Sequence, residues 1–300
     1  MKRSPSHPGF PATLIALTAT CLIQAQDELH SQPIVTTLTG RYIAETGLGS
    51  GAKATSATGG LDIHFPLATF GDFELSQGVS YQREQTDFSG FDTFLPVKAS
   101  PYKGANEVKL TPGLAYKWSD ELRLRTGFSA EYSGADSARF GDSITFGGYV
   151  MGAYKLSNEL TVGAGFAIFE RLARATRYLP IAGLDWRINE NWHLSSLNGP
   201  NLRLSYLWNS GLTLFAQGEF EYRDIRLKDT ASLPNGVVRY RSFPLSLGAE
   251  WNITDRLSAD LFGGAAIAQQ YDFTRQDGGS LRKSDEKTAP FGALAMRYRF

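Results

Sequence analysis

Cysteine is almost absent from this sequence. The one cysteine, Cys21, lies within an apolar run near the start of the chain. If that run is removed after export, no thiol remains, which excludes a disulfide framework, a thiolate metal site and a cysteine nucleophile. The four histidines form no pair at metal-ligand spacing, and no calcium-loop pattern is present. We therefore expect no metal and no cofactor.

Excess charge and long apolar runs are also lacking. Lys plus Arg and Asp plus Glu number 30 each, so nothing indicates a nucleic-acid partner. Beyond residues 13–23, no apolar stretch approaches the about 18 residues that a membrane-spanning helix needs. What is abundant is glycine, with 31 residues, and aromatic side chains, at 12%.

The first residues have the features of a secretory signal peptide. Lys2 and Arg3 precede the apolar run at residues 13–23, and Ala25 is a small residue before a polar stretch. We predict cleavage after Ala25, although Ile23, two residues earlier, is larger than such sites prefer. Two alternatives are a buried N-terminal helix and a lipoprotein anchored through Cys21, which Thr20 does not favour.

Hydrophobicity alternates with a period of two along most of the remaining chain. In residues 122–132, Leu122, Leu124, Phe128 and Tyr132 fall on one face, and charged or small residues fall on the other. Similar patterns cover residues 73–82, 108–118 and 214–223. These runs are longer than the about 5–6 residues of strands in soluble sheets, and they match tilted membrane strands. A secreted β-sandwich is the alternative, but it would have to bury nearly every apolar face.

A degenerate repeat marks one set of turns. Residues 116–122 (Tyr-Lys-Trp-Ser-Asp-Glu-Leu) resemble residues 154–160 (Tyr-Lys-Leu-Ser-Asn-Glu-Leu), and residues 186–192, 206–212 and 251–257 follow the same plan. Ser, Asn, Asp and Gly favour tight turns. The flanking aromatic residues are predicted to form an interfacial girdle: Tyr116, Trp118, Tyr154, Trp186, Tyr206, Trp208 and Trp251.

Longer polar connections alternate with these turns, at residues 85–104, 134–142, 228–236 and 272–287. Short periplasmic turns and long extracellular loops are typical of outer-membrane barrels. We count about 14 strands, including a short hairpin near residues 192–208, with 12 as the runner-up. The predicted organisation is a signal peptide (1–25), a periplasmic N-terminal segment (26–33) and an antiparallel up-and-down transmembrane β-barrel (34–300) in the bacterial outer membrane.

The last residues resemble the C-terminal strand signal of bacterial outer-membrane barrels. Leu294, Met296, Tyr298 and Phe300 alternate with charged or small residues, and phenylalanine is last. The resemblance implies that Tyr298 and Phe300 form the assembly signal. Expected partners are outer-membrane lipid, the barrel-assembly machinery, periplasmic chaperones and an unidentified small solute.

The mature chain as a whole resembles an uncharacterised family of bacterial outer-membrane β-barrels, described only as a domain of unknown function. The resemblance depends on the aromatic turn repeat and on Leu-Asn-Gly-Pro-Asn-Leu-Arg-Leu-Ser-Tyr at residues 197–206. It implies a fold and a location, and no catalytic residues.

Charged residues on the inward face of the predicted strands are candidates to line the lumen. Their signs are mixed, so they either pair across the lumen and close it or line a wet channel. They are Lys109, Lys117, Arg123, Arg125, Glu131, Asp185, Arg187, Arg203, Glu219, Glu221, Arg223, Arg297 and Arg299.

One constellation resembles a hydrolase site. Asp62 and His64 share one face of a predicted strand, and the next strand offers Ser76 and Ser80. A serine nucleophile with His64 as base would need Asp62 to orient the imidazole. Residues i and i+2 on a strand point in parallel, so we expect a polar pair in a hydrated lumen and no enzyme.

Three functions remain. The first is a passive pore for small solutes, for which residues 85–104 are the one connection long enough to form a constriction with charges of one sign. The second is a structural or surface-interaction barrel with a plugged lumen, which fully paired inward charges would favour. The third is the hydrolase.

Overall fold

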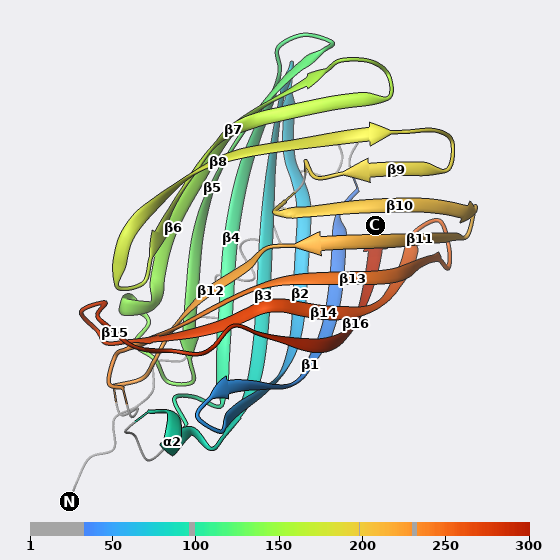
Figure 1. The fold of residues 1–300 in the computed structure, drawn as a ribbon. Coiled ribbons are helices and arrows are strands. Elements are labelled where there is room, and N and C mark those ends of the chain that lie inside the picture. Colours follow the sequence, from blue (N-terminus) through green and yellow to red (C-terminus); the bar gives the residue numbers. More distant parts are fainter. Residues whose placement is uncertain (1–32, 96–99, 198, 230–232) are drawn as a thin grey trace, which may run out of the picture.

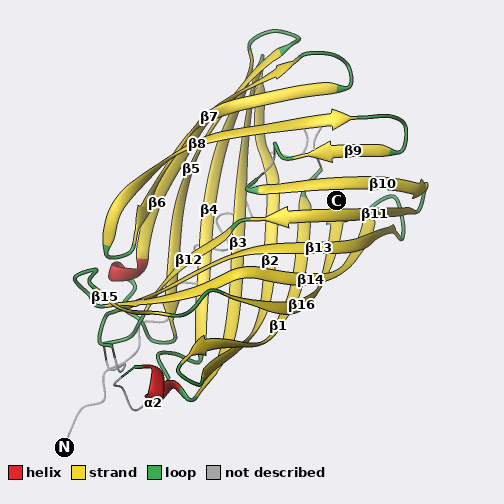
Figure 2. Ribbon diagram, in the orientation of Figure 1, coloured by secondary structure: helices red, strands yellow, loops and turns green. Residues whose placement is uncertain are grey.

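A computed structural model describes residues 33–95, 100–197, 199–229 and 233–300. The predicted signal peptide (1–25) and almost all of the predicted periplasmic segment (26–33) lie outside these residues. The described chain is almost entirely β-structure (Figure 2). Its strands are β1 (Val35–Gly49), β2 (Ala52–Phe70), β3 (Phe73–Ser89), β4 (Gly104–Lys117), β5 (Leu122–Ala135), β6 (Ile144–Lys155), β7 (Leu160–Arg171), β8 (Arg174–Arg187), β9 (Trp192–Ser195), β10 (Asn201–Asn209), β11 (Leu212–Glu219), β12 (Glu221–Arg226), β13 (Val237–Asn252), β14 (Leu257–Thr274), β15 (Ser280–Lys283) and β16 (Lys287–Arg299).

Helical structure in the described residues is confined to two short segments. The helix α2 covers Phe91–Phe94, and a single 3-10 turn, η1, covers Gly141–Ser143. No described helix is long and apolar enough to span a membrane.

The strands form one closed sheet in which sequence neighbours pair antiparallel. β16 pairs with β1 in the register Val35↔Arg299, and β13 pairs with both β11 and β14. β11 and β12 lie end to end along β13, and β15 and β16 lie end to end along β14. The elements therefore make fourteen barrel strands, so the predicted fold and the count of fourteen are confirmed. The short hairpin predicted near residues 192–208 is present as β9 and β10.

The outward face of the barrel is apolar. Large side chains with about half or more of their surface exposed include Leu38 (54%), Phe166 (68%), Tyr178 (73%) and Leu247 (72%). They occupy one side of strands whose other side faces the lumen, as period-two alternation requires. A closed barrel leaves no second sheet to cover such a surface, so lipid must cover it, and the β-sandwich alternative is wrong.

The repeated turns have a common hydrogen-bond pattern. Ser119 Oγ accepts from the amides of Glu121 (3.1 Å) and Leu122 (3.0 Å). Ser157, Asn189 and Thr254 accept from the amides two and three residues ahead in the same way. A side chain that satisfies two amides in this way explains why Ser, Asn and Thr recur there. The chain ends lie at this rim, where Phe300 N donates to Ile34 O (3.0 Å), and we assign it as the periplasmic end.

The barrel is narrower at the other, extracellular end. There Arg226 of β12 pairs in parallel with Gly134 of β5, two strands that are not neighbours around the ring. This bridge closes a smaller ring of nine strands (β1 to β5, β12, β13, β14 and β15 with β16), which leaves out β6 to β10. An apolar cluster, the extracellular core, fills this ring: Leu48, Ala52, Ala54, Phe91, Phe94, Leu95, Tyr102, Ala105, Ala135, Ile225, Leu227, Leu233, Val238, Tyr240, Tyr271 and Phe273.

The connection between β3 and β4 supplies much of the extracellular core. Phe91 and Phe94 of α2 contact the Phe273 ring edge-on at centroid distances of 5.2 and 5.7 Å, and Phe88 contacts Tyr102 at 5.4 Å. The described parts of residues 85–104, which are 85–95 and 100–104, therefore contribute an apolar cap to the extracellular end.

Candidate functional site

A cavity of about 1150 Å³ lies inside the barrel beneath the extracellular core. We call it the lumen cavity. Strands β2 to β8 form most of its wall, and β12 and the connection between β9 and β10 complete it. The cavity exists because the barrel is wide where all fourteen strands take part, whereas barrels of about eight strands are filled by their own side chains.

Charged side chains line one part of the lumen cavity. Lys109 lies 3.4 Å from Glu131, and Arg123 lies 3.4 Å from Glu74. Arg125 also lines the cavity and makes no ion pair within the described part of the chain. This part of the lining is polar and carries a cationic group that no carboxylate of the described residues neutralises.

A buried ion-pair network forms the boundary between the lumen cavity and the extracellular core. Arg223 of β12 contacts Glu84 at 2.5 Å and Glu221 at 3.2 Å. Glu221 also pairs with Arg41, and Glu84 accepts a hydrogen bond from Tyr102 (2.8 Å). Because these charges satisfy one another, they can be buried without leaving any of them alone. The network ties β1, β3 and β12 to the connection that caps the barrel.

The opposite face of β12 has a second network. Tyr222 accepts from Arg239 Nε (2.7 Å) and Arg171 Nε (2.8 Å), and donates to Asp224 (2.9 Å). Arg239 contacts Asp224 at 2.7 Å, and Asp272 lies 3.0 Å from Arg174. Arg171 and Arg174 flank the β7–β8 turn, so this hairpin packs over the outer face of β12 to β14. At this level the barrel wall overlaps itself.

The predicted lumen-lining residues occupy four places. Lys109, Arg123, Arg125, Glu131 and Arg223 line the lumen cavity, and Glu221 pairs with Arg223 beside it. Arg203 and Arg297 share Glu250, at 2.6 and 3.7 Å. Glu219 lies in the middle of the wall, where β11 ends and β12 begins. The others lie toward the periplasmic strand ends, with Lys117 paired to Asp120 (2.6 Å): Lys117, Asp185, Arg187 and Arg299.

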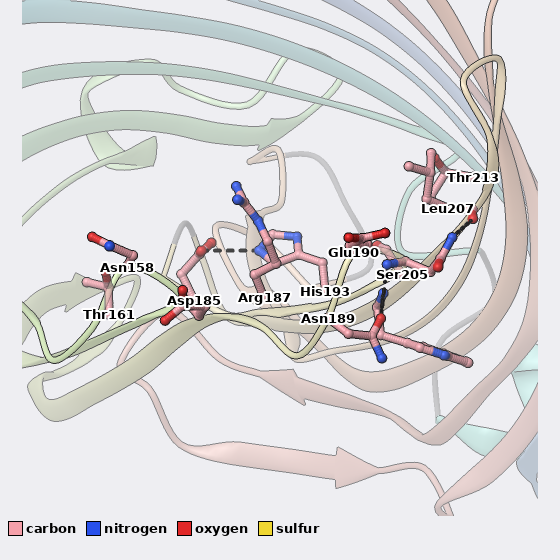
Figure 3. Close-up of a pocket in the computed structure, with 13 residues that line it drawn as sticks. Asn158, Thr161, Asp185, Arg187, Asn189, Glu190, His193, Ser205, Leu207 and Thr213 are labelled. Atoms are coloured by element: carbon pink, nitrogen blue, oxygen red, sulfur yellow. Dashed lines mark hydrogen bonds and ion pairs between the residues drawn. The ribbon is translucent and has the colours of Figure 1, made fainter.

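A smaller pocket of about 340 Å³ lies at the periplasmic rim. Figure 3 shows Asp185 and His193 pointing toward each other across it, with Nε2 and Oδ1 3.1 Å apart. Arg187 and Glu190 also line it. The pocket is shallow, and its residues come from turns and strand ends.

The aromatic residues predicted as a girdle flank the short turns. Trp118 (65% exposed) and Trp208 (64%) are the most exposed of them, and Trp118 packs edge-on against Tyr116 at 6.0 Å. Tyr298 and Phe300 contact each other at 4.7 Å at the same rim. Their roles as a girdle and as an assembly signal remain predictions.

The residues of the possible hydrolase site do not assemble in the part of the chain that is described. His64 and Ser76 line the lumen cavity, but no hydrogen bond joins His64 to Asp62 or to a serine among the described residues. Within those residues, no group of three His, Cys, Asp or Glu side chains is placed to hold a metal.

Sequence reasoning missed the apolar part of the lining. Leu179, Ile181, Leu197, Pro200 and Phe220 line the lumen cavity together with the charged residues. The signal in the sequence was the short hairpin predicted near residues 192–208, because its first strand is too short to pair along the whole of the preceding strand. In the structure β9 has four residues and β8 has fourteen.

Known structures resemble this fold at low sequence identity. An outer membrane channel from Pseudomonas putida F1 matches with 12% identity, a TM-score of 0.50 and coverage of 90% of this chain and 96% of that one. The Pseudomonas putida toluene transporter TodX matches with 11% identity, a TM-score of 0.46 and 92% coverage of both chains. The translocator domain of the autotransporter NalP from Neisseria meningitidis matches with 14% identity, a TM-score of 0.40 and coverage of 96% and 97%.

A closed fourteen-stranded barrel with an apolar outward face defines an integral outer-membrane β-barrel protein. Residues 110–299, more than half of the sequence, match the family described as "Domain of unknown function (DUF6268)", and the chain belongs to that family. No curated protein matches the sequence.

Proposed function

We propose that this barrel is a passage for a small solute, with the lumen cavity as the chamber that holds the solute in transit. The observation that carries the proposal is the cavity itself, about 1150 Å³ with cationic and apolar walls. Ligand sites in proteins commonly measure about 300–1,000 Å³ and combine apolar walls with a few polar groups. A barrel that served only as a scaffold could be filled by its own side chains, as barrels of about eight strands are.

In the resting protein the extracellular mouth is closed. The nine-stranded ring there is filled by the extracellular core, and Phe273 is fully buried within it. A small polar solute crosses here when these packed side chains move aside, so we expect its passage to be slow. We therefore expect the resting protein to conduct ions poorly.

A structural or surface-interaction barrel is the second candidate, and a specific observation favours it. The buried charges around Arg223 are paired with one another, as expected for a closed plug. The ion pairs, however, account for the extracellular end and leave the lumen cavity below it unexplained.

Solute flux into proteoliposomes tests the proposal. Ser129 lines the lumen cavity, and the next residue, Ala130, points to the other face of β5. We expect Ser129→Trp to lower uptake of small sugars or amino acids by about tenfold, because lining side chains set passage. Ala130→Trp is the matched control and should leave uptake near wild type.

Heat-modifiable migration on a gel confirms that each variant is folded. If wild type passes no solute, or if both variants take up solute at the same rate, the passage is refuted. The structural or surface-interaction barrel then becomes the favoured function.

A further inference from the structure

Among the described residues, the wall of the barrel is incomplete beside β8. β9 pairs with β8 only at Asp185, Trp186 and Arg187, and Ser196 N adds one hydrogen bond to Leu184 O (2.7 Å). From Arg174 to Gly183, β8 has β7 on one side and no described strand on the other. Figure 1 shows how little of the length of β8 the short β9 accompanies.

The lumen cavity reaches this free edge. Leu179 and Ile181 point inward, and Pro180 and Ala182 point to the lipid side, yet all four line the same cavity. Along residues 174–183 no described strand pairs with this edge of β8, so no described strand separates the cavity from the membrane beside residues 179–182. Proline has no amide hydrogen and belongs on edges, so Pro180 suits a strand without a second neighbour.

The other side of this gap is also formed by described residues. Leu197 and Pro200 of the β9–β10 connection lie below it, and Phe220 lies across from β8. Phe220 packs against Phe243 at 5.0 Å, and Phe243 is 46% exposed on the outward face. We call the gap bounded by residues 179–182, Leu197, Pro200 and Phe220 the side opening.

Polar contacts close the side opening toward the extracellular end. Arg171 donates to Tyr222, and the Arg177 guanidinium lies 5.6 Å from the centre of the Tyr222 ring. The side opening is thus apolar toward the membrane and flanked by arginines above. Farther inside, the lumen cavity presents Arg123 and Arg125.

An unpaired backbone edge in hydrocarbon is costly, because lipid offers no hydrogen-bond partner. Such an edge persists where it borders a cavity that admits polar groups. The path leads from an apolar exit to Arg125, which has no ion-pair partner among the described residues. This chemistry complements a molecule with an apolar body and an anionic head.

We propose that the side opening between β8 and β12 is a lateral route by which an amphipathic anion moves between the membrane and the lumen cavity. The inference rests on the proposed passage and names both its substrate class and its path. The apolar body passes residues 179–182 and Phe220, and the head group reaches Arg125.

A matched pair of substitutions tests the route. Ala182 and Ala164 are cross-strand partners on the lipid side of β8 and β7, and both are exposed. Ala182 lines the lumen cavity and has β7 as its one described strand neighbour, whereas Ala164 does not line the cavity and is paired on both sides. Ala182→Trp should obstruct the side opening, and Ala164→Trp places the same side chain on the intact wall.

The probe is dansyl-tagged undecanoate, delivered in phosphatidylcholine vesicles to vesicles that hold the folded barrel. Energy transfer from tryptophan to dansyl reports binding. We expect Ala182→Trp to slow both association and dissociation by about tenfold while the equilibrium affinity stays near wild type, because a blocked path leaves the site intact. Ala164→Trp should bind at the wild-type rate, and Ser129→Trp should bind with reduced affinity.

Equal rates for Ala182→Trp and Ala164→Trp would overturn the lateral route. If wild type and Ser129→Trp still differ in probe affinity and in sugar flux, the passage stands and only its path is wrong. If wild type neither binds the probe nor passes sugar, the proposed function itself fails.

Discussion

The two ends of this barrel are built from the same strands but close in different ways. At the periplasmic end, fourteen strands pair in sequence order, and short turns with a common hydrogen-bond pattern join them. At the extracellular end, β12 passes inside the wall to meet β5, and nine strands close around an apolar core. Period-two alternation sets strand faces at both ends, but it does not say which strands meet.

The largest expected effect comes from breaking the buried network where the two regions meet. Arg223→Ala leaves Glu84 and Glu221, with side chains 5% and 15% exposed, without their shared cation. Removing one partner of a buried ion pair costs about 3–5 kcal/mol. Urea unfolding followed by gel migration measures the loss of stability.

Arg123→Ala is the control for Arg223→Ala. The Arg123 side chain is 40% exposed in the lumen cavity and lies 3.4 Å from Glu74. We expect a change of about 0–1 kcal/mol, as for other exposed pairs. Equal losses in the two variants would show that the network does not hold the narrow end together.

The next effect is expected in the extracellular core. Phe94 is 4% exposed and packs on Phe273. Phe94→Ala removes a buried ring, which costs about 3 kcal/mol in a well-packed site, and it leaves a gap in the cap. Single-channel recording should show conductance steps that wild type lacks.

Phe128→Ala serves as its comparison. Phe128 is 50% exposed on the outward face of β5, away from the cap. Phe128→Ala should therefore have the same conductance as wild type. Open channels in wild type would contradict a sealed extracellular end.

A smaller effect is expected at the periplasmic turns. Ser157 Oγ accepts from the amides of Glu159 (3.1 Å) and Leu160 (3.2 Å). Ser157→Ala should lower the free energy of unfolding by about 1 kcal/mol. Ser157→Thr should retain it, because Thr254 occupies the equivalent position in another turn, and a loss with threonine would point to packing instead.

The smallest effect concerns an exposed ion pair at the extracellular end. Arg83 donates to Asp136 at 2.8 Å and lowers the pKa of that carboxyl, which lies just beyond β5. A carboxyl with a lowered pKa in the folded state stabilises the protein above its ordinary pKa and loses that contribution as the pH falls. Asp136→Asn should cost under about 1 kcal/mol near neutral pH.

Urea midpoints at neutral and acid pH measure this effect. The difference between wild type and Asp136→Asn should shrink as the pH falls. A difference that grows on acidification would contradict the pairing with Arg83.

The sequence predicts the periplasmic region better than the extracellular region. The strand over residues 122–132, the short hairpin near residues 192–208 and the Ser and Asn turns follow from local patterns, and the structure contains them. Each depends on neighbours in sequence, as alternation and tight turns do.

The extracellular region depends on contacts that no local pattern encodes. In the sequence, Tyr222 continues the apolar face of residues 214–222. In the structure the strand is interrupted at Phe220, and Arg171 of the overlapping β7–β8 hairpin and Arg239 donate hydrogen bonds to Tyr222. Residues 85–104 appear as a polar loop, although Phe88, Phe91 and Phe94 recur every third position and pack inward. Which element covers a face is decided by tertiary packing.

The seam between β1 and β16 determines the order in which this barrel can be completed. Val35 pairs with Arg299, so the ring closes between the two strands most distant in sequence. We expect these strands to meet last, because closing a longer loop costs more chain entropy. Until then both strands have open edges that invite pairing with other chains. A folding intermediate with two such edges needs protection in transit, which is the reason we expect periplasmic chaperones and the assembly machinery to act on this chain before its ends join.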